Sequence, residues 1–86
     1  MKSFRLVVSS PDGKLFDEEC VKFDARGTEG EFSVMAGHIP FVTFVLAGTC
    51  TITSPDESVK KAECEGGLLT VNGQGVNLLS GSFRIN

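Results

Sequence analysis

Three cysteines and one histidine are the residues whose types could bind a metal or act as nucleophiles. They are Cys20, Cys50, Cys64 and His38. Tetrahedral zinc sites usually include a close ligand pair such as Cys-x-x-Cys, and none of these spacings provides one. An odd number of cysteines also cannot pair completely within one chain. We therefore expect no metal site, and reduced thiols that pack as small core or edge residues in a reducing compartment.

Two glutamates on either side of a glycine are the other candidates for chemistry. Glu29 and Glu31 enclose Gly30 and have the residue types of a general acid–base pair, although two carboxylates on a polar loop are more often simply solvated. The sequence lacks a Gly-x-x-x-x-Gly-Lys phosphate loop, a Gly-x-Ser-x-Gly elbow and a His-Glu-x-x-His pair. We therefore predict no catalytic residues and no cofactor.

Length, charge and hydropathy exclude further classes. A chain of 86 residues predicts one domain over residues 1–86, and its net charge of −3 argues against nucleic-acid binding, which needs a basic surface. The longest apolar-rich stretch, residues 39–48, is half of the ~20 residues that a membrane-spanning helix requires. No apolar signal-peptide core follows the N-terminus. We therefore expect this chain to reach a membrane only through a partner.

The elements that must position these residues are strands. Alternating or β-branched residues predict short strands at residues 4–8, 14–16, 20–23, 31–35, 41–46, 49–53, 59–64, 68–71 and 76–79. Residues 41–46 are almost continuously apolar and predict a strand buried on most sides. Residues 59–64 carry Lys60 and Lys61 and predict an edge strand. Turn signals lie at residues 11–13 and 72–75, where Asn72-Gly73 predicts a hairpin.

These strands predict the fold class. No segment shows a convincing helical period, and glycines and prolines fall between the strands. Many short strands at regular spacing are typical of a sandwich or barrel. We predict an all-β chain that folds as a small antiparallel β-sandwich or flattened barrel with no substantial helix.

Residues 27–40 are the most unusual segment. Gly27-Thr28-Glu29-Gly30-Glu31-Phe32, followed by Gly37-His38-Ile39-Pro40, resembles the signature of the epsilon subunit of F-type ATP synthases. Residues 11–16, 48–52, 65–71 and 76–79 resemble the first turn, a Gly-x-x-x-Ile strand, the Gly-Gly hairpin and the last strand of that family. The likeness runs from about Phe4 to Leu79.

The sequence also departs from the family pattern. Arg26 and Ala36 stand where the family often has proline, and Ser33 stands where it often has glycine. These changes affect the stiffness of loops and leave the fold intact. Residues 80–86 end the sequence where the family continues into a C-terminal helical hairpin, so the inhibition of ATP hydrolysis associated with that hairpin is not expected of this chain.

The resemblance implies a mechanical role. It implies a rotor subunit of the central stalk that couples the gamma subunit to the membrane c-ring during proton- or sodium-driven ATP synthesis. Such a subunit is not an enzyme and lies peripherally on the cytoplasmic face of the cell membrane. By the same resemblance, the residues that contact the c-ring are Glu29, Gly30 and Glu31, and those that contact the gamma subunit are Ser10, His38, Val42 and Thr43.

Each assignment has an alternative. Glu31 as a solvated residue, His38 as a residue that holds its own loop, Ser10 as a cap of the turn at Pro11 and Thr43 as an ordinary strand residue all fit the sequence. The chain as a whole could instead be a free-standing β-sandwich that binds a protein or a small ligand. An exposed apolar patch opposite the glutamate loop would favour the rotor subunit, whereas a single deep apolar pocket would favour the binding module.

Overall fold

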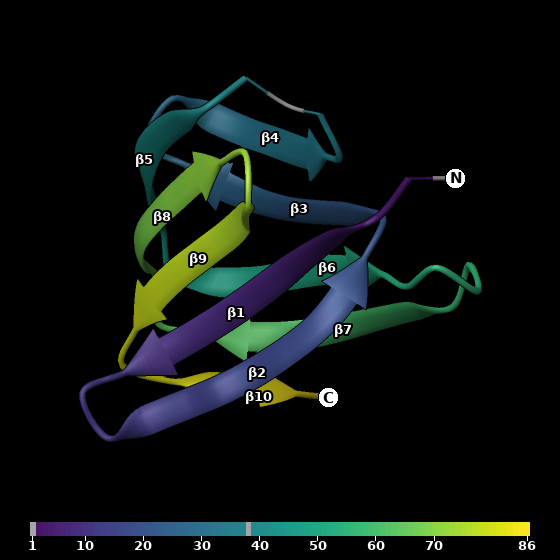
Figure 1. Cartoon of the computed structure of the whole chain (residues 1–86). Coiled ribbons are helices and arrows are strands. Elements are labelled where there is room, and N and C mark those ends of the chain that lie inside the picture. The colour runs from purple at the N-terminus through teal and green to yellow at the C-terminus, as the bar shows by residue number, and fades with distance from the viewer. Residues whose placement is uncertain (1, 38) are drawn as a thin grey trace.

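The computed structural model describes residues 2–37 and 39–86, in which ten strands form one sheet that folds over on itself (Figure 1). The strands are β1 (Phe4–Ser10), β2 (Gly13–Cys20), β3 (Lys22–Gly27), β4 (Gly30–Met35), β5 (Phe41–Val45), β6 (Gly48–Thr53), β7 (Val59–Cys64), β8 (Gly67–Asn72), β9 (Gly75–Ser80) and β10 (Phe83–Ile85). Over the described ranges there is no helix, and therefore none that could cross a bilayer. The predicted all-β class is confirmed.

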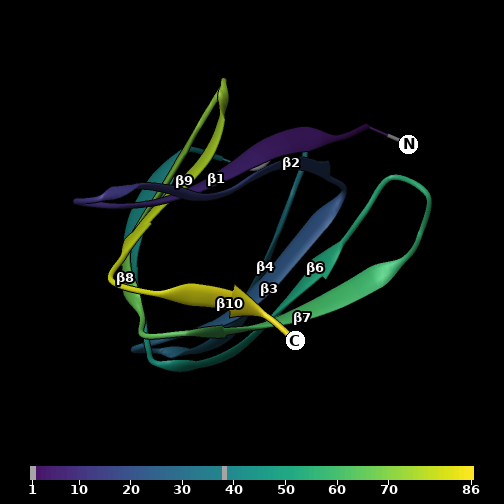
Figure 2. The same ribbon diagram turned by 90° about the horizontal axis from the view of Figure 1, so that it is seen from below.

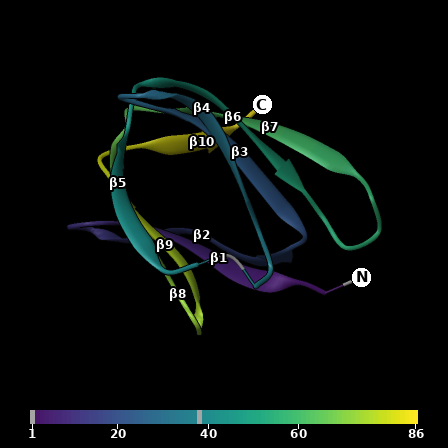
Figure 3. The same cartoon turned by 90° about the horizontal axis from the view of Figure 1, so that it is seen from above.

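The sheet forms two layers because it bends at one corner. Its strand order is β10-β7-β6-β3-β5-β8-β9-β1-β2, with β4 paired to β3. Only residues 46–47 separate β5 from β6, and only residues 65–66 separate β7 from β8, so both pairs pass around the corner together. We call β10-β7-β6-β3-β4 layer A and β5-β8-β9-β1-β2 layer B. Figures 2 and 3 show the two layers on opposite sides of the core.

Two glycines make this corner possible. Gly66 and Gly67 have φ angles of 88° and 155°, which L side chains rarely adopt. A Cβ atom on Gly67 would overlap the carbonyl oxygen of Leu79, and one on Gly66 would overlap that of Val45. At the corner, the backbones of neighbouring strands therefore lie so close together that only glycine fits at positions 66 and 67.

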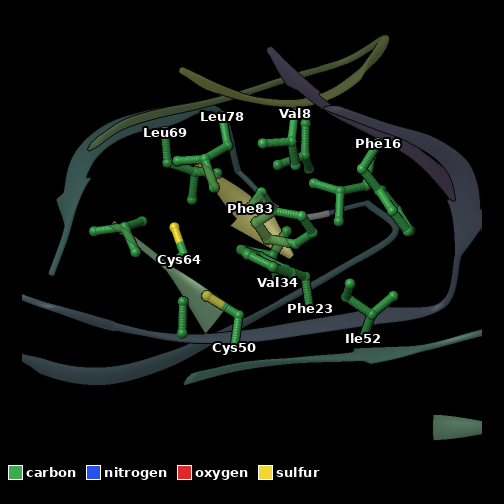
Figure 4. Packing of buried hydrophobic residues seen from close by; sticks show 14 of the residues in the cluster. Val8, Phe16, Phe23, Val34, Cys50, Ile52, Cys64, Leu69, Leu78 and Phe83 are labelled. Atoms are coloured by element: carbon green, nitrogen blue, oxygen red, sulfur yellow. The ribbon is translucent and has the colours of Figure 1, made fainter. Parts of the chain in front are cut away.

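The core lies between the layers and is built from every second residue of each strand. The largest fully buried side chains are Leu6, Val8, Cys20, Phe23, Val34, Cys50, Ile52, Leu69 and Leu78 (Figure 4). Burying a side chain the size of leucine or phenylalanine contributes about 1.5–3 kcal/mol. All three cysteines are buried, so their predicted placement as small core residues is confirmed.

The edges of the two layers meet where β2 approaches β7 and β10. The rings of Phe16 and Phe83 lie 5.6 Å apart between centroids. The Lys60 ammonium lies 2.8 Å from a carboxylate oxygen of Glu18. These contacts nearly close the sandwich into the flattened barrel that the sequence predicted.

Two predictions about individual strands are wrong. β5 is not buried on most sides, because Val42 and Phe44 point outward and are 62% and 63% exposed. β7 is not an edge strand, because it pairs with β6 on one side and with β10 on the other. The sequence analysis did not predict β10, whose three residues are too few to show a period.

Two further details differ from the predicted strand pattern. The strand predicted at residues 20–23 is divided, since β2 ends at Cys20 and β3 begins at Lys22. Strands β1 and β9 pair in parallel, from Leu6 opposite Val76 to Ser9 opposite Leu79, whereas the other pairings between described strands are antiparallel. Hydrophobic alternation does not reveal strand direction, because inward and outward residues alternate in both cases.

Candidate interaction surfaces

The β3–β4 hairpin presents the glutamates that the sequence analysis assigned to a c-ring contact. Gly27 pairs with Gly30, so the turn consists of Thr28 and Glu29. Gly30 has a φ angle of 122°, which favours glycine and lets the chain reverse within two residues. Glu29 and Glu31 are exposed. Glu31 stands opposite Arg26 in the strand register, so this carboxylate lies beside a basic residue on the outer face of layer A.

The outer face of layer A is mostly polar, although Met35 and Val59 on this face are 55% and 58% exposed. Its outward residues include Lys22, Asp24, Arg26, Glu31, Ser33, Thr49, Thr51, Thr53, Lys61 and Glu63. The Ser33 hydroxyl donates a hydrogen bond to Asp24, and the Thr49 hydroxyl donates to Glu63 at 2.6 Å. The bond from Thr49, followed by one from Asn86, holds the pKa of Glu63 below its ordinary value. The Glu63 carboxylate therefore remains charged at neutral pH.

The outer face of layer B carries an apolar strip. Phe44, Leu68 and Leu79 stand side by side on β5, β8 and β9, and Val42 lies on the same side of β5. Phe44 is 63% exposed and Leu79 is 57% exposed, while Leu68 is half-buried between them. We call these four residues the apolar strip. A contiguous exposed apolar surface is typical of a protein–protein contact.

A cleft at the edge between β4 and β5 joins the two outer faces. Its volume is ≈500 Å³, and its lining includes Glu29, Gly30, Glu31, Val42 and Thr43. The structure therefore brings the predicted c-ring residues and two of the predicted gamma-subunit residues to one edge of the molecule.

The rings of Phe32 and Phe41 also line this cleft. They pack edge to face, with centroids 6.2 Å apart. Thr43 stands opposite the buried Leu69 and is half-buried, so its side chain lies on the opposite side of β5 from Val42. Val42 and Thr43 therefore cannot both belong to the same flat contact surface.

Ser10 lies apart from this cleft, at the turn between β1 and β2. Its hydroxyl accepts a hydrogen bond from the Asp12 amide at 3.1 Å, which agrees with the turn-capping role that the sequence left open. Ser10 also lines a groove of ≈530 Å³ together with Pro11, Leu79 and Ser80. Ser10 is therefore next to the apolar strip. The remaining predicted gamma-subunit residue, His38, lies outside the described residues.

The sequence analysis missed Phe44, Leu68 and Leu79 as surface residues. No alternation of polar and apolar residues within 41–46 reveals the exposure of Phe44, because the one polar residue, Thr43, lies on the opposite side of β5. Leu68 and Leu79 were recognised only as members of strands.

The described residues offer contact surfaces. Within residues 2–37 and 39–86, no three potential metal ligands come together. Every buried side-chain nitrogen or oxygen atom in these ranges has a hydrogen-bond partner. The features left to explain are therefore the polar face, the apolar strip and the cleft between them.

Known sequences match almost the whole chain. The family model for the ATP synthase delta/epsilon chain β-sandwich domain matches residues 3–84. The sodium-ion-specific ATP synthase epsilon chain of Acetobacterium woodii is 37% identical over 71 residues, which are 83% of this chain and 53% of that protein. An epsilon chain of a Bradyrhizobium strain is 34% identical over 93% of this chain and 58% of its own length. The chain thus spans little more than half the length of these relatives.

Solved structures agree on the fold. A chain in the Euglena gracilis mitochondrial ATP synthase, in a structure of OSCP, F1 and the c-ring, superposes with a TM-score of 0.88 at 21% identity, covering 96% of this chain and 53% of that one. A chain in the central stalk and c-ring structure of the Tetrahymena thermophila enzyme gives a TM-score of 0.75 at 9% identity, covering 95% of this chain and 66% of that one. With the family match over residues 3–84, the chain belongs to the family of ATP synthase delta/epsilon chain β-sandwich domains.

Proposed function

We propose that residues 1–86 act as one domain of a rotor subunit in an F-type ATP synthase. This subunit couples the gamma subunit to the c-ring during proton- or sodium-driven ATP synthesis and carries out no catalysis itself. It associates peripherally with the cytoplasmic face of the cell membrane, through the complex. The observation that carries the proposal is the contrast between the mostly polar outer face of layer A, where Met35 and Val59 are isolated apolar residues, and the contiguous apolar strip on the outer face of layer B.

The apolar strip supplies the contact with the gamma subunit. Phe44 and Leu79 expose more than half of their surface in the isolated chain. Removing apolar surface from water contributes about 25 cal/mol per Å², so covering these side chains is favourable. Val42 belongs to the strip and Ser10 lies beside its Leu79 end. Thr43, on the other side of β5, contributes from the cleft, and His38 belongs to the same predicted set.

The β3–β4 hairpin supplies the contact with the c-ring. Glu29 lies in the two-residue turn of this hairpin, and Gly30 and Glu31 are the first two residues of β4. The side chains of Glu29 and Glu31 are exposed. A carboxylate forms stronger hydrogen bonds with a basic partner than with a neutral one. Polar loops of a ring that carry basic groups are therefore suitable partners for this end of the molecule.

The packing between the layers suits a mechanical link. The core contains closely packed side chains from both layers, and interiors of this kind have low compressibility. The Phe16–Phe83 contact and the Lys60–Glu18 ion pair connect the edges of the layers. A force applied to the hairpin would therefore reach the apolar strip with little internal deformation.

The alternative is a free-standing module that binds a protein or a small ligand. A ligand-binding module needs one enclosed apolar pocket with a few polar groups. The described residues instead line several separate surface cavities, of which the ≈530 Å³ groove at Leu79 lies beside the apolar strip. The exposed strip favours the rotor subunit.

The deciding experiment is binding to a purified gamma subunit. Phe44→Lys and Leu79→Lys should each weaken binding by at least about tenfold, because each places a charge in the apolar contact and removes a large side chain. Calorimetry would measure the affinity, and circular dichroism would check that the variants fold. Thr51→Lys, on the outer face of layer A, is the matched control and should bind normally. Equal affinity for all three variants would refute the assignment of the strip.

A further inference from the structure

Cys50 and Cys64 face each other inside layer A (Figure 4). They lie on the paired strands β6 and β7, where Cys50 stands opposite Ala62 and Cys64 stands opposite Gly48. Because both cross-strand partners are small, the two sulfur atoms have room to meet along the diagonal between the strands. Both side chains are buried on the inner face of layer A.

Two polar groups lie against the Cys64 sulfur. This sulfur accepts a hydrogen bond from the Gly66 amide at 3.1 Å and lies 3.5 Å from the Ser80 hydroxyl oxygen. The Cys50 thiol, then the Ser80 hydroxyl and the Gly66 amide, lower the pKa of Cys64 to about 6. The neighbouring Cys64 side chain, and then burial, raise the pKa of Cys50. Cys64 is therefore the member that forms a thiolate, and Cys50 is the member that retains its proton.

A small molecule can approach Cys64 from the surface. Its side chain is 6% exposed, and the residue lines a surface cavity of ≈380 Å³ beside β10. Phe83 and Arg84 form part of the wall of this cavity. Cys50 is 1% exposed and does not line this cavity. This arrangement places the nucleophile beside the cavity and the second thiol in the core.

Cys20 provides a contrast within the same chain. It is fully buried on β2, and its thiol donates a weak hydrogen bond to the Glu18 carbonyl at 3.7 Å. Burial first, and then the charge of Glu18, raise the pKa of Cys20 to about 11. A thiol in this state is a poor nucleophile. The three cysteines are therefore not chemically equivalent.

We propose that Cys50 and Cys64 are a redox-active dithiol that hydrogen peroxide converts to an intramolecular disulfide. The Cys64 thiolate attacks one peroxide oxygen, the O–O bond breaks, and the departing hydroxide takes a proton to become water. The Cys50 sulfur, after losing its proton, then attacks the Cys64 sulfenic acid and releases a second water molecule. Overall, two thiols and one peroxide give one disulfide and two waters.

The position of the pair makes this oxidation reversible. Diagonal neighbours across antiparallel strands are farther apart than directly opposite ones, and a disulfide between them carries strain. Strained disulfides are more readily reduced than unstrained ones. The modification would link β6 to β7 beside the corner formed by residues 65–67. It is independent of the rotor function proposed above.

The test is oxidation of the folded chain by dilute hydrogen peroxide, followed by intact mass and peptide mapping. We expect a loss of about 2 Da, a peptide joining Cys50 to Cys64, and full reversal by dithiothreitol. Cys20→Ser should behave in the same way. A chain whose thiols stay unmodified while it remains folded would overturn the proposal, as would a disulfide that involves Cys20 or links two molecules.

Two variants separate the roles of the pair. Cys50→Ser should stop at a Cys64 sulfenic acid, a gain of about 16 Da that dimedone traps. Cys64→Ser should react at least about tenfold more slowly than the natural chain, because burial still opposes ionisation of the two remaining thiols, Cys20 and Cys50. Equal rates in Cys64→Ser and the natural chain would contradict the assignment of Cys64 as the nucleophile. Circular dichroism checks folding, and if either serine variant does not fold, the peptide map of the natural chain decides.

Discussion

Gly67 and Gly73 show how differently two glycines of one strand pair are constrained. Gly67 has a φ angle of 155°, and its α-carbon faces the Leu79 carbonyl without room for a methyl group. Gly73 lies in the β8–β9 turn, where an added Cβ would meet no atom within 4 Å. Glycine is therefore required at position 67, whereas position 73 has room for a larger residue.

We expect Gly67→Ala to destabilise the fold by at least about 3 kcal/mol, since both the steric overlap and the backbone conformation oppose it. Gly73→Ala is the control and should leave stability within about 1 kcal/mol of the natural chain. Urea unfolding of the two variants measures the difference. A Gly67→Ala chain of natural stability would show that the corner can relax, contrary to the tight packing described here.

Asp17 makes the outer face of layer B sensitive to acid. The Lys14 ammonium, and then the Arg5 guanidinium, hold the pKa of Asp17 below its ordinary value. A carboxyl with a lowered pKa stabilises the folded state above its unfolded pKa of about 4, and this stabilisation is lost as the pH falls through the folded value. The ion pairs measure 2.9 Å to Lys14 and 2.6 Å to Arg5.

Asp17→Asn should therefore lower the melting temperature slightly at pH 7 and by less at pH 3, because the stabilisation by this charge declines as the pH falls below the unfolded pKa. The effect is small, because these charges face solvent. Thermal unfolding at both pH values measures it. Asp12→Asn, which removes an exposed carboxylate from the neighbouring turn, is the comparison. An equal loss at both pH values would mean that Asp17 acts through packing and not through its charge.

At the scale of the element, β10 decides how the sandwich closes. It pairs with β7, from Phe83 opposite Cys64 to Ile85 opposite Ala62. Phe83 is buried against Phe16 of β2, whereas Ile85 is 41% exposed on the same strand. One aromatic side chain therefore provides much of the contact between the last strand and the opposite layer.

Phe83→Ala should cost about 3–5 kcal/mol, the usual range for deleting a buried phenylalanine ring. Ile85→Ala should cost less than about 1.5 kcal/mol, because that side chain is partly exposed already. Denaturant unfolding compares the two. Similar losses in both variants would show that β10 contributes through its backbone pairing and not through the Phe83 ring.

The β8–β9 hairpin shows how far a turn signal predicts an element. The Asn72-Gly73 signal located the turn correctly, because Asn72 pairs with Gly75. The Asn72 side chain accepts a hydrogen bond from the Gln74 amide at 2.8 Å. The positive φ angle, 148°, falls at Gly75, where a Cβ would crowd the Arg5 carbonyl of β1. The neighbouring strand, and not the local dipeptide, determines which glycine is needed.

At the scale of the whole molecule, the two outer faces differ in chemistry and are held in a fixed relation by one core. Layer A presents mostly charged and hydroxyl side chains, and layer B presents the apolar strip. In the proposed rotor, these faces have different partners. A change on one face should therefore leave the contact of the other face intact.

Glu31→Lys tests this separation. It should weaken attachment to the c-ring, because it reverses the charge of the hairpin, and it should leave gamma-subunit binding and folding unchanged. Reconstitution with membrane sectors and calorimetry with the gamma subunit measure the two contacts. Glu57→Lys, on the exposed loop between β6 and β7, is the control of equal charge. Unchanged membrane attachment in Glu31→Lys would count against the proposed ring contact.

The sequence by itself determined the all-β class, most of the strand positions, the turns and the family. These features depend on alternation, glycine position and local motifs, all of which lie within a few residues of one another. Only the folded chain shows that β5 exposes Val42 and Phe44, that β1 pairs in parallel with β9, and that Cys50 and Cys64 are diagonal neighbours on paired strands. The physical reason is that these properties depend on which distant segment lies alongside a strand. The alternation of apolar residues shows which side chains lie on the same face of a strand. Only the packing of other segments decides whether that face is buried.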